Sequence, residues 1–363
     1  MARITAVISG KKWRVGRWSM IPLLAAIVLS KGVRLAGVGL LALLSLPLAA
    51  EWHTDGQDIM GTRVNVTLWH EDATQGQAAV AAVMAEMRRI DAEFSPYIET
   101  SQLSRVNRLA PLATADKPLV ISAELARLID KSLYYSRLSE GAFDITFASL
   151  GRFYDYRKGK KPGLEQQHDL LPAIDYRLVK LDLDGPHLYF AHPKVYLDLG
   201  GIAKGYAVDQ GIDIVRRFGV EHASISAGGD SRVLGDKQGR PWLVGIKNPR
   251  ADDRIAIALP LADVAISTSG DYERYFIDSD GSRVHHILNP GTGQPTTGIA
   301  SVSIIGPQGF DTDPLSTTVF VLGVEKGLAL INRLPGFDAV IITSAGKVHY
   351  SQGLAPPEPA DSP

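Results

Sequence analysis

Two stretches of the sequence combine residue types and spacings that suit phosphate chemistry. The first runs from Val195 to Asp209 and reads V-Y-L-D-L-G-G-I-A-K-G-Y-A-V-D. Its apolar start, Val195 to Leu199, predicts a strand with Asp198 near its end, and the glycine pair that follows predicts a turn into a helix from about Tyr206 to Phe218. A glycine turn lets backbone approach a ligand closely, and free N–H groups at a helix start attract anions. With Lys204 beside the turn, the stretch could hold a phosphate, although an ordinary strand-to-helix turn explains the same residues.

The second stretch contains Asp313 and Thr317, which are four residues apart and therefore share one side of a helix. A carboxylate and a hydroxyl, together with a backbone carbonyl, are hard oxygen ligands of the kind that Mg²⁺ or Ca²⁺ takes. The alternative is a helix cap, in which Asp311, Thr312 or Asp313 opens the helix and the nearby hydroxyls bond to local backbone.

His286 could act as a general base, because an unperturbed imidazole titrates near neutral pH. It is one of nine histidines, so a histidine satisfied in a loop is the competing interpretation, and His285 has no better claim. The glycines match neither a P-loop nor the dinucleotide fingerprint. The serines near the Gly228-Gly229 pair lack a nucleophile-elbow context, so a serine hydrolase is unsupported.

The elements that must position these residues are mostly short strands covered by a few helices. Apolar periodicity and capping residues predict helices at Gln75–Phe94, Ser101–Asn107, Ser122–Ser139, Tyr206–Phe218, Asp313–Leu322 and Val324–Arg333. Alternation and turn signals predict strands within Ile59–Leu68, Leu178–Phe190, His222–Leu234, Pro241–Lys247, Arg254–Leu261, Val264–Ser269, Ser301–Ile305 and Ala339–Thr343, with a hairpin turn at Asp278–Ser282 and a loop over Tyr154–Gln167. The pattern is α+β, with mixed, largely antiparallel sheets, rather than a regular βαβ series. Two similar strand-turn-helix passages, Val195–Phe218 and Ile304–Leu330, hint at an internal duplication.

Composition places the chain among globular proteins, with 363 residues, 45% hydrophobic and 21% charged. A net charge of −1 gives no support to nucleic-acid binding. There are no cysteines, which excludes disulfides, thiolate metal sites, a cysteine nucleophile and a lipid-modified cysteine.

The first fifty residues are expected to lie outside the fold. Basic residues precede an apolar run, Met20–Leu29, and a second run, Leu35–Ala50, follows Lys31 and Arg34 and ends in small residues. This pattern predicts a signal peptide with cleavage near Ala50, an uncleaved N-terminal anchor being the alternative, and translation starting at Met20 is also possible. Both versions predict a periplasmic or otherwise extracytoplasmic protein, and the uncleaved version would be tethered to the inner membrane through this segment alone. A single domain is expected over residues 51–350, followed by a Pro-rich, disordered tail at 351–363.

Six motifs, in order along the chain from about Met60 to Thr343, resemble one family, the ApbE flavin transferases. They are G-A-F-D-I-T, L-D-L-G-G-I-A-K-G-Y-A-V-D, G-G-D with P-W-L-V-G-I-K-N-P, S-T-S-G-D-Y-E-R-Y-F, H-I-L-N-P-G-T-G-Q-P and D-P-L-S-T-T-V-F-V-L-G. The resemblance implies a duplicated, T-fold-like α+β architecture. It also implies Mg²⁺-dependent cleavage of FAD, with transfer of FMN to a Ser or Thr hydroxyl of a target protein, giving a phosphoester and AMP. The implied acceptors are subunits of membrane redox complexes.

The resemblance also assigns residues. It implies a metal site at Asp313, Thr317 and the Gly201 carbonyl, and His286 as the base for the acceptor hydroxyl. The implied FAD-binding positions are Met60, Tyr97, Ala142, Phe143, Asp144, Asp198, Lys204 and Ile287, with Tyr97 and Phe143 offering aromatic surface. Two departures from the family pattern are Ser316, where some members have an Asp, and Pro314, which is acceptable in a first helical turn.

Two rival functions fit part of this pattern. A periplasmic FAD carrier would bind flavin without chemistry, and an FAD pyrophosphatase would use water in place of the acceptor hydroxyl. The presence of both Asp313 and His286 favours an enzyme over a carrier, since storage needs neither.

Overall fold

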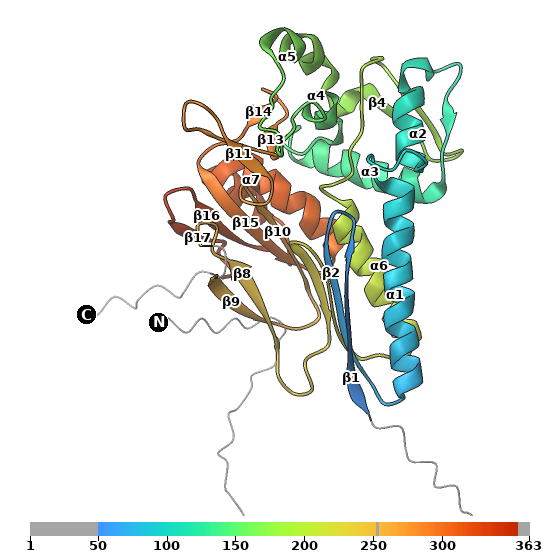
Figure 1. The fold of residues 1–363 in the computed structure, drawn as a ribbon, viewed down its shortest axis with the longest axis vertical. Coiled ribbons are helices and arrows are strands. Elements are labelled where there is room, and N and C mark those ends of the chain that lie inside the picture. The colour runs from blue at the N-terminus through green and yellow to red at the C-terminus, as the bar shows by residue number, and fades with distance from the viewer. Residues whose placement is uncertain (1–49, 252–253, 355–363) are drawn as a thin grey trace, which may run out of the picture.

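A central sheet of eight strands organises the molecule. The computed structural model describes residues 50–251 and 254–354 (Figure 1). The sheet has the order β1-β2-β6-β7-β10-β15-β16-β17, and each adjoining pair is antiparallel. Its strands are β1 (Glu51–Ile59), β2 (Thr62–His70), β6 (His222–Ala227), β7 (Asp230–Leu234), β10 (Ala265–Gly270), β15 (Ile299–Gly306), β16 (Asp338–Thr343) and β17 (Val348–Tyr350).

Smaller sheets and the helices surround this centre. The other strands are β3 (Leu119–Val120), β4 (Val179–Asp182), β5 (His187–Phe190), β8 (Trp242–Lys247), β9 (Ile255–Leu261), β11 (Tyr275–Ile277), β12 (Arg283–His285), β13 (Leu288–Asn289) and β14 (Gln294–Pro295). The α-helices are α1 (Ala73–Phe94), α2 (Gln102–Leu109), α3 (Ala123–Leu138), α4 (Ala148–Gly151), α5 (Leu164–Leu170), α6 (Ala203–Arg217) and α7 (Gly309–Ile331). The predicted α+β class with mainly antiparallel sheets is confirmed.

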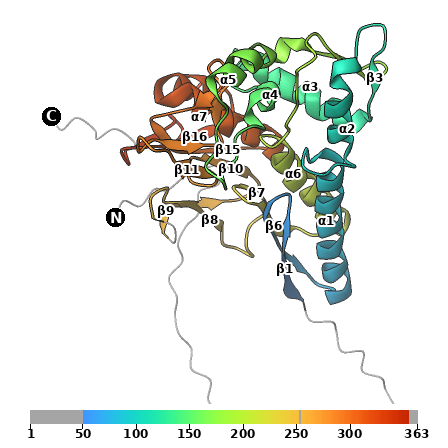
Figure 2. The ribbon, with the colours of Figure 1, turned by 45° about the horizontal axis from the view of Figure 1, so that its top comes forward.

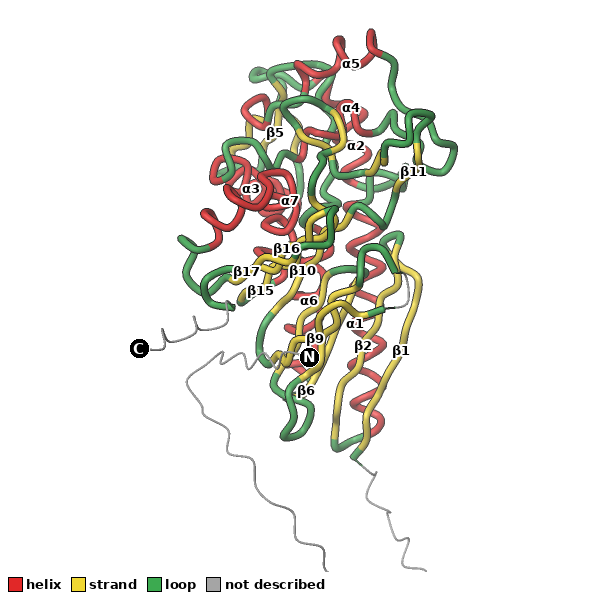
Figure 3. The backbone as a smooth tube through the Cα atoms, turned by 90° about the vertical axis from the view of Figure 1, so that its left-hand side faces the viewer, coloured by secondary structure: helices red, strands yellow, loops and turns green. Residues whose placement is uncertain are grey.

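The two faces of the sheet carry different cores. Helices α1, α6 and α7 pack on one face, and the β8–β9 ribbon packs on the other. Successive residues of one strand serve opposite faces: Ile304 lies in the helix-side core and Ile305 in the ribbon-side core. Helices α3, α4 and α5 gather beyond one end of the sheet (Figure 2), and β1 and β2 lie over α1 (Figure 3).

The sheet contains the same strand order twice. In the first half, β1 and β2 are followed by helices and then by β6 and β7; in the second, β10 and β15 are followed by α7 and then by β16 and β17. Gly323, with φ of 79°, breaks α7 into two helical segments, so that each half has helices between its second and third strands. The halves join where β7 pairs with β10. A duplication is therefore present in the topology. The two passages that hinted at it are not its equivalent parts, because Val195–Leu199 forms no strand, whereas Ile304 belongs to β15.

Helices α6 and α7 meet at two glycines. A Cβ on Gly205 would lie 2.0 Å from the Gly309 carbonyl oxygen, and a Cβ on Gly309 would lie 2.5 Å from the Gly205 carbonyl oxygen. No side chain fits at either position, so the two backbones touch directly. This contact fixes the spacing of the helices that carry Lys204 and Asp313.

Each of these helices also caps the other. Asp209 of α6 accepts hydrogen bonds from the backbone N–H groups of Gly309 and Phe310 at the start of α7, both at 2.9 Å. Asp313 of α7 accepts one from the N–H of Gly205 in the first turn of α6, at 2.9 Å. A carboxylate at a helix N-terminus satisfies unpaired donors and opposes the positive end of the helix dipole.

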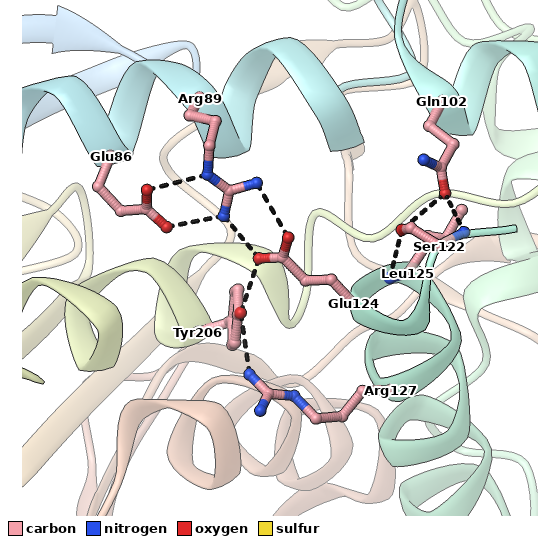
Figure 4. Close-up of polar contacts among 8 residues, drawn as sticks. All are labelled: Glu86, Arg89, Gln102, Ser122, Glu124, Leu125, Arg127 and Tyr206. Carbon is pink, nitrogen blue, oxygen red and sulfur yellow. Dashed lines mark hydrogen bonds and ion pairs between the residues drawn. The ribbon is translucent and has the colours of Figure 1, made fainter. Parts of the chain in front are cut away.

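A polar network ties α3 to α1 and α6 (Figure 4). The guanidinium of Arg89 donates to both carboxylate oxygens of Glu124, at 2.6 and 2.9 Å, and the hydroxyl of Tyr206 donates to Glu124 Oε1 at 2.7 Å. Because Tyr206 follows Lys204 by two residues, this network also fixes the start of α6.

The structure corrects several local predictions. Val195–Leu199 is extended but is not a strand, because the amide of Asn107 takes the place of a neighbouring strand: it accepts from the Leu197 N–H and donates to the Leu197 carbonyl. Strand β1 was not predicted, and α5 begins inside the stretch expected to be a loop.

The two site helices begin earlier than the sequence suggested. Helix α6 begins at Ala203 and α7 at Gly309, so the expected cap at Asp311, Thr312 or Asp313 is wrong. Pro314 consequently lies in the second turn of α7, rather than in the first. Helix α7 is long and apolar enough to span a membrane by composition, but 50% of its apolar window is buried in the fold, as in a core helix.

The remaining predictions on the organisation of the chain fall largely outside the described part. The signal or anchor at residues 1–50 lies almost entirely in residues that the structure does not describe, as does the tail from residue 355 on. The prediction of disorder is wrong for 351–354, because Ser351 and Leu354 are buried and Leu354 belongs to the ribbon-side core. The 51–350 domain boundaries stay a prediction.

We expect Gly205→Ala to destabilise the protein by roughly 1–3 kcal/mol, because the added methyl must push α7 away from α6. Urea unfolding followed by circular dichroism measures the change. Gly163→Ala is the control, because a Cβ there meets no atom within 4 Å. Equal unfolding midpoints for the two variants would contradict the direct backbone contact.

Candidate active site

The candidate site lies at one end of the central sheet, where two hairpin turns sit side by side. Met60 and Gly61 form the β1–β2 turn, with φ of 57° and 69°. Positive φ at both central residues is the signature of a type I′ hairpin, and it is uncommon for Met. The Met60 N–H donates to Asp91 Oδ2 at 3.1 Å, which helps to hold this conformation. A Cβ on Gly228 of the β6–β7 turn would lie 2.6 Å from Thr62 Oγ1, so the two turns are neighbours.

The β6–β7 turn places Asp230 inside the site. Gly228 has φ of 61°, and a Cβ on Gly229 would lie 2.5 Å from the Thr268 carbonyl oxygen. This close approach requires the glycine pair. Asp230 is the first residue of β7 and is 2% exposed.

Lys204 lies between two carboxylates. Its Nζ is 2.7 Å from Asp230 Oδ2 and 3.5 Å from Asp313 Oδ2. It also donates to the Gly200 carbonyl at 3.2 Å. Burial lowers the pKa of Lys204, but the charges of Asp230 and Asp313 outweigh burial and raise the pKa above its ordinary value. Lys204 is therefore a fixed positive charge at the start of α6.

Asp313 and Thr317 lie one turn apart on α7 and face the start of α6. Burial and the charge of Asp230 raise the pKa of Asp313 to about 7. The Thr317 hydroxyl is 3.2 Å from Ser269 Oγ, and a Cβ on Gly201 would lie 3.5 Å from Thr317 Oγ1. The structure therefore brings together the three residues predicted to hold a metal.

These residues fit a magnesium ion. Two buried carboxylates share one ammonium, so the cluster has an excess of negative charge that a cation would offset. The described residues contain no group of three or more His, Asp or Glu side chains placed to hold a metal. One carboxylate, one hydroxyl and one backbone carbonyl match the few protein ligands that Mg²⁺ takes. Ser316 donates to the Asp313 carbonyl at 2.8 Å and lies 2.8 Å from Ser269 Oγ, so it is satisfied within the protein.

The two adjacent histidines have different surroundings. Nε2 of His285 lies 2.8 Å from the Thr296 carbonyl, and its Nδ1 accepts from the Ile287 N–H at 3.3 Å, so His285 is held by the backbone. Nδ1 of His286 is buried and has no hydrogen-bond partner among the described residues. Burial, and then the charge of Arg274, lower the pKa of His286 well below its ordinary value. His286 is therefore neutral at pH 7 and able to accept a proton.

Among the predicted FAD-binding positions, some side chains face solvent and others support the backbone. Tyr97 is 79% exposed, whereas Phe143 is buried beside Gly201, 3.1 Å from the position of a Cβ there. Asp144 is also buried, and its carboxylate accepts from Thr146 and from the Tyr176 N–H. Phe143 and Asp144 thus hold the loop beside Gly201 in place.

The other predicted positions adjoin this loop and the histidine pair. Asp198 is half-buried and accepts from the Gly200 N–H at 2.6 Å. Ala142 is half-buried, and Ile287 is buried directly after His286.

Sequence reasoning assigned no role to four residues of the site: Tyr156, Asp230, Ser269 and Arg274. Tyr156 makes an edge contact with the His286 ring, with centroids 6.5 Å apart. Arg274 is exposed, and its charge acts on both Asp198 and His286. Asp230, Ser269 and Arg274 all lie inside recognised motifs, so their signal was present. Tyr156 lies in the stretch expected to be a featureless loop and carried no signal.

The chain is similar to known proteins in both sequence and fold. A profile described as the ApbE family matches residues 60–341. The chain is 31% identical over 315 residues to an FAD:protein FMN transferase of Treponema pallidum, covering 82% of this chain and 86% of the relative. It is 30% identical over 335 residues to an FAD:protein FMN transferase of Vibrio cholerae, covering 89% of this chain and 97% of the relative.

Solved structures show the same likeness. The crystal structure of an ApbE protein from Thermotoga maritima aligns with a TM-score of 0.75 at 32% identity, covering 83% of this chain and 97% of that one. The flavin transferase ApbE from Vibrio cholerae aligns with a TM-score of 0.73 at 26% identity, covering 84% and 98%.

The buried carboxyls predict how stability depends on pH. The pKa of Asp313 is raised to about 7, and burial raises the pKa of Asp144 to about 6. At these two carboxyls the native state therefore binds protons more tightly than the unfolded chain. Their contribution to the free energy of unfolding of metal-free protein should fall as pH rises from about 4 to about 7, whereas the lowered pKa of His286 contributes in the opposite direction.

We expect Asp313→Asn to remove the contribution of Asp313 to this pH dependence of stability, because the amide does not titrate. Between pH 4 and pH 8, the free energy of unfolding of the variant should rise relative to that of wild type by on the order of 2–4 kcal/mol. Urea unfolding at several pH values in the presence of a chelator measures both curves. Parallel curves for variant and wild type would show that Asp313 does not titrate in this range.

Proposed function

Because the chain belongs to the ApbE family and is an FAD:protein FMN transferase, which transfers FMN from FAD to a target protein, we propose that it uses Mg²⁺ and modifies a Ser or Thr hydroxyl. The observation that carries this proposal is the joint arrangement of Lys204, Asp313 and a neutral His286 at one end of the sheet. It provides a fixed cation, a hard-oxygen donor set and a proton acceptor in one place.

In the proposed reaction, the acceptor oxygen attacks the phosphorus on the FMN side of the FAD pyrophosphate. A bond forms between that oxygen and phosphorus, the bond from phosphorus to the bridging oxygen breaks, and AMP leaves with the bridging oxygen. The hydroxyl proton passes to a ring nitrogen of His286. Nδ1 is buried and has no hydrogen-bond partner among the described residues that would fix the tautomer.

The cationic groups bind and orient the pyrophosphate. Lys204 lies at the N-terminal turn of α6, where backbone N–H groups also favour an anion. Asp313, Thr317 and the Gly201 carbonyl would hold Mg²⁺, which when bound supplies charge neutralisation for the phosphate oxygens. Tyr97, with its exposed ring, would offer an aromatic surface to FAD, with Asp198 and Met60 as further proposed contacts.

We further propose an extracytoplasmic location and acceptors among the subunits of membrane redox complexes. The basic and apolar pattern of residues 1–50 supports the location. Cell fractionation tests it: recovery of the full-length, uncleaved protein in the cytoplasm would contradict it.

The decisive experiment incubates the purified protein with FAD, Mg²⁺ and a periplasmic redox subunit and reads flavin fluorescence after denaturing electrophoresis. We expect a fluorescent acceptor band, its absence in the presence of a chelator, and its loss with Asp313→Ala, which removes the carboxylate ligand. Free FMN without a labelled band would indicate hydrolysis, and intact FAD would indicate a carrier. Undiminished labelling by Asp313→Ala would rule out the assigned metal site.

We expect His286→Ala to lower kcat for transfer by about 10²–10⁴-fold, because the hydroxyl loses its proton acceptor, while the Kd for FAD changes far less. Stopped assays with saturating FAD give kcat, and quenching of flavin fluorescence gives the Kd. His285→Ala is the neighbouring control. Any loss of kcat in this variant should be matched by a loss of thermal stability, since His285 is held by backbone groups. Equal losses of affinity and rate in His286→Ala would mean that His286 only positions the ligand.

A further inference from the structure

Asp230 is the one member of the charged cluster that no step of the proposed reaction uses. It is 2% exposed, and its Oδ2 lies 2.7 Å from Lys204 Nζ. The glycine pair before it makes a turn too tight for side chains, so its position is set by backbone geometry. The proposed reaction leaves unexplained why backbone geometry holds this buried carboxylate against Lys204.

The distances indicate a competition between two carboxylates for Lys204. Nζ is at hydrogen-bond distance from Asp230 and only at ion-pair distance, 3.5 Å, from Asp313. The Gly200 carbonyl accepts from the same ammonium at 3.2 Å. Asp230 and Gly200 thus hold the ammonium, while Asp313 keeps its close hydrogen bond with the Gly205 N–H, at 2.9 Å.

We propose that Asp230 is a positioning residue that holds Lys204 away from Asp313. Lys204 then stays directed at the pyrophosphate of FAD, and the Asp313 carboxylate is left able to bind a cation. This inference rests on the roles proposed above for Lys204 and Asp313. In the absence of Asp230, the ammonium closes on Asp313 and the two groups neutralise each other.

A simpler explanation makes the opposite prediction. If Asp230 acted only through its negative charge, its removal would reduce repulsion of the anionic pyrophosphate and FAD would bind more tightly. If Asp230 positions Lys204, its removal weakens FAD binding. The sign of the change in FAD affinity, measured without divalent cations, therefore separates the two.

The experiment compares Asp230→Asn with wild type in the presence of a chelator, using flavin fluorescence or calorimetry to obtain the Kd for FAD. We expect the Kd to rise at least tenfold. In a Lys204→Met background, adding Asp230→Asn should change the Kd less than twofold, because there is no ammonium left to position. Unchanged or tighter FAD binding by Asp230→Asn, or the same rise in both backgrounds, would overturn the proposal.

A second variant covers the case in which Asp230→Asn does not fold. Asp230→Glu keeps the charge but moves the carboxylate by one methylene group. A positioning role therefore predicts weaker FAD binding, whereas a pure charge effect predicts an unchanged Kd for FAD. Asp338→Asn is the matched control: Asp338 accepts from Ser351 Oγ at 2.6 Å on β16, outside the site. It should leave the Kd for FAD unchanged.

Metal binding supplies a further readout that does not depend on turnover. Titration with Mn²⁺, followed by electron paramagnetic resonance, should show weaker binding to Asp230→Asn, and the affinity should recover in the double variant with Lys204→Met, where the competing ammonium is gone. Further weakening in the double variant would contradict the proposal. Because FAD and Mn²⁺ binding are measured without an acceptor, failure of the transfer reaction itself would leave this test intact.

Discussion

The site depends on the direct contact of α6 and α7 and on the exchange of carboxylate caps between them. Asp209 caps α7 and Asp313 caps α6, across the glycine contact of Gly205 and Gly309. Asp313 thereby has two tasks in the proposed function: it satisfies an N–H group at the start of α6, and it would offer a carboxylate to a cation. A residue that holds two helices together cannot move far, so the geometry of the proposed metal site is fixed by the same bond that stabilises the fold.

The duplicated topology explains why the site lies where it does. Asp230 begins β7, the last strand of the first half, and Ser269 belongs to β10, the first strand of the second half. The hydroxyl of Ser269 reaches Thr317 on α7, while Asp230 reaches Lys204 on α6. The charged cluster is therefore assembled from both halves where they join, and neither half contains it alone.

Sequence patterns predicted the elements whose signals are local. Ser101 and Ser122 cap α2 and α3 as expected, because a cap and its helix are neighbours in the chain. Sequence patterns failed where a residue far away in the chain determines the local structure. The start of α7 is set by Asp209, about a hundred residues earlier, and the extended backbone at Leu197 is completed by Asn107, which comes from α2. Motifs pointed to most residues of the candidate site, but not to the support that Phe143 and Asp144 give to a loop, since burial is a property of the packed structure.

The charges that would bind FAD also set the strength of the base. Arg274 and Lys204 both lower the pKa of His286, after burial, so the imidazole is neutral but weakly basic in the absence of ligand. In the proposed reaction a bound pyrophosphate brings negative charge to those same cations. Its field opposes theirs at the imidazole, so the protonated form of His286 becomes less costly when FAD is in place. The acceptor hydroxyl would then be activated mainly in the FAD complex. This coupling needs no conformational change, only that the charges of Lys204, Arg274 and the bound pyrophosphate all act on the imidazole.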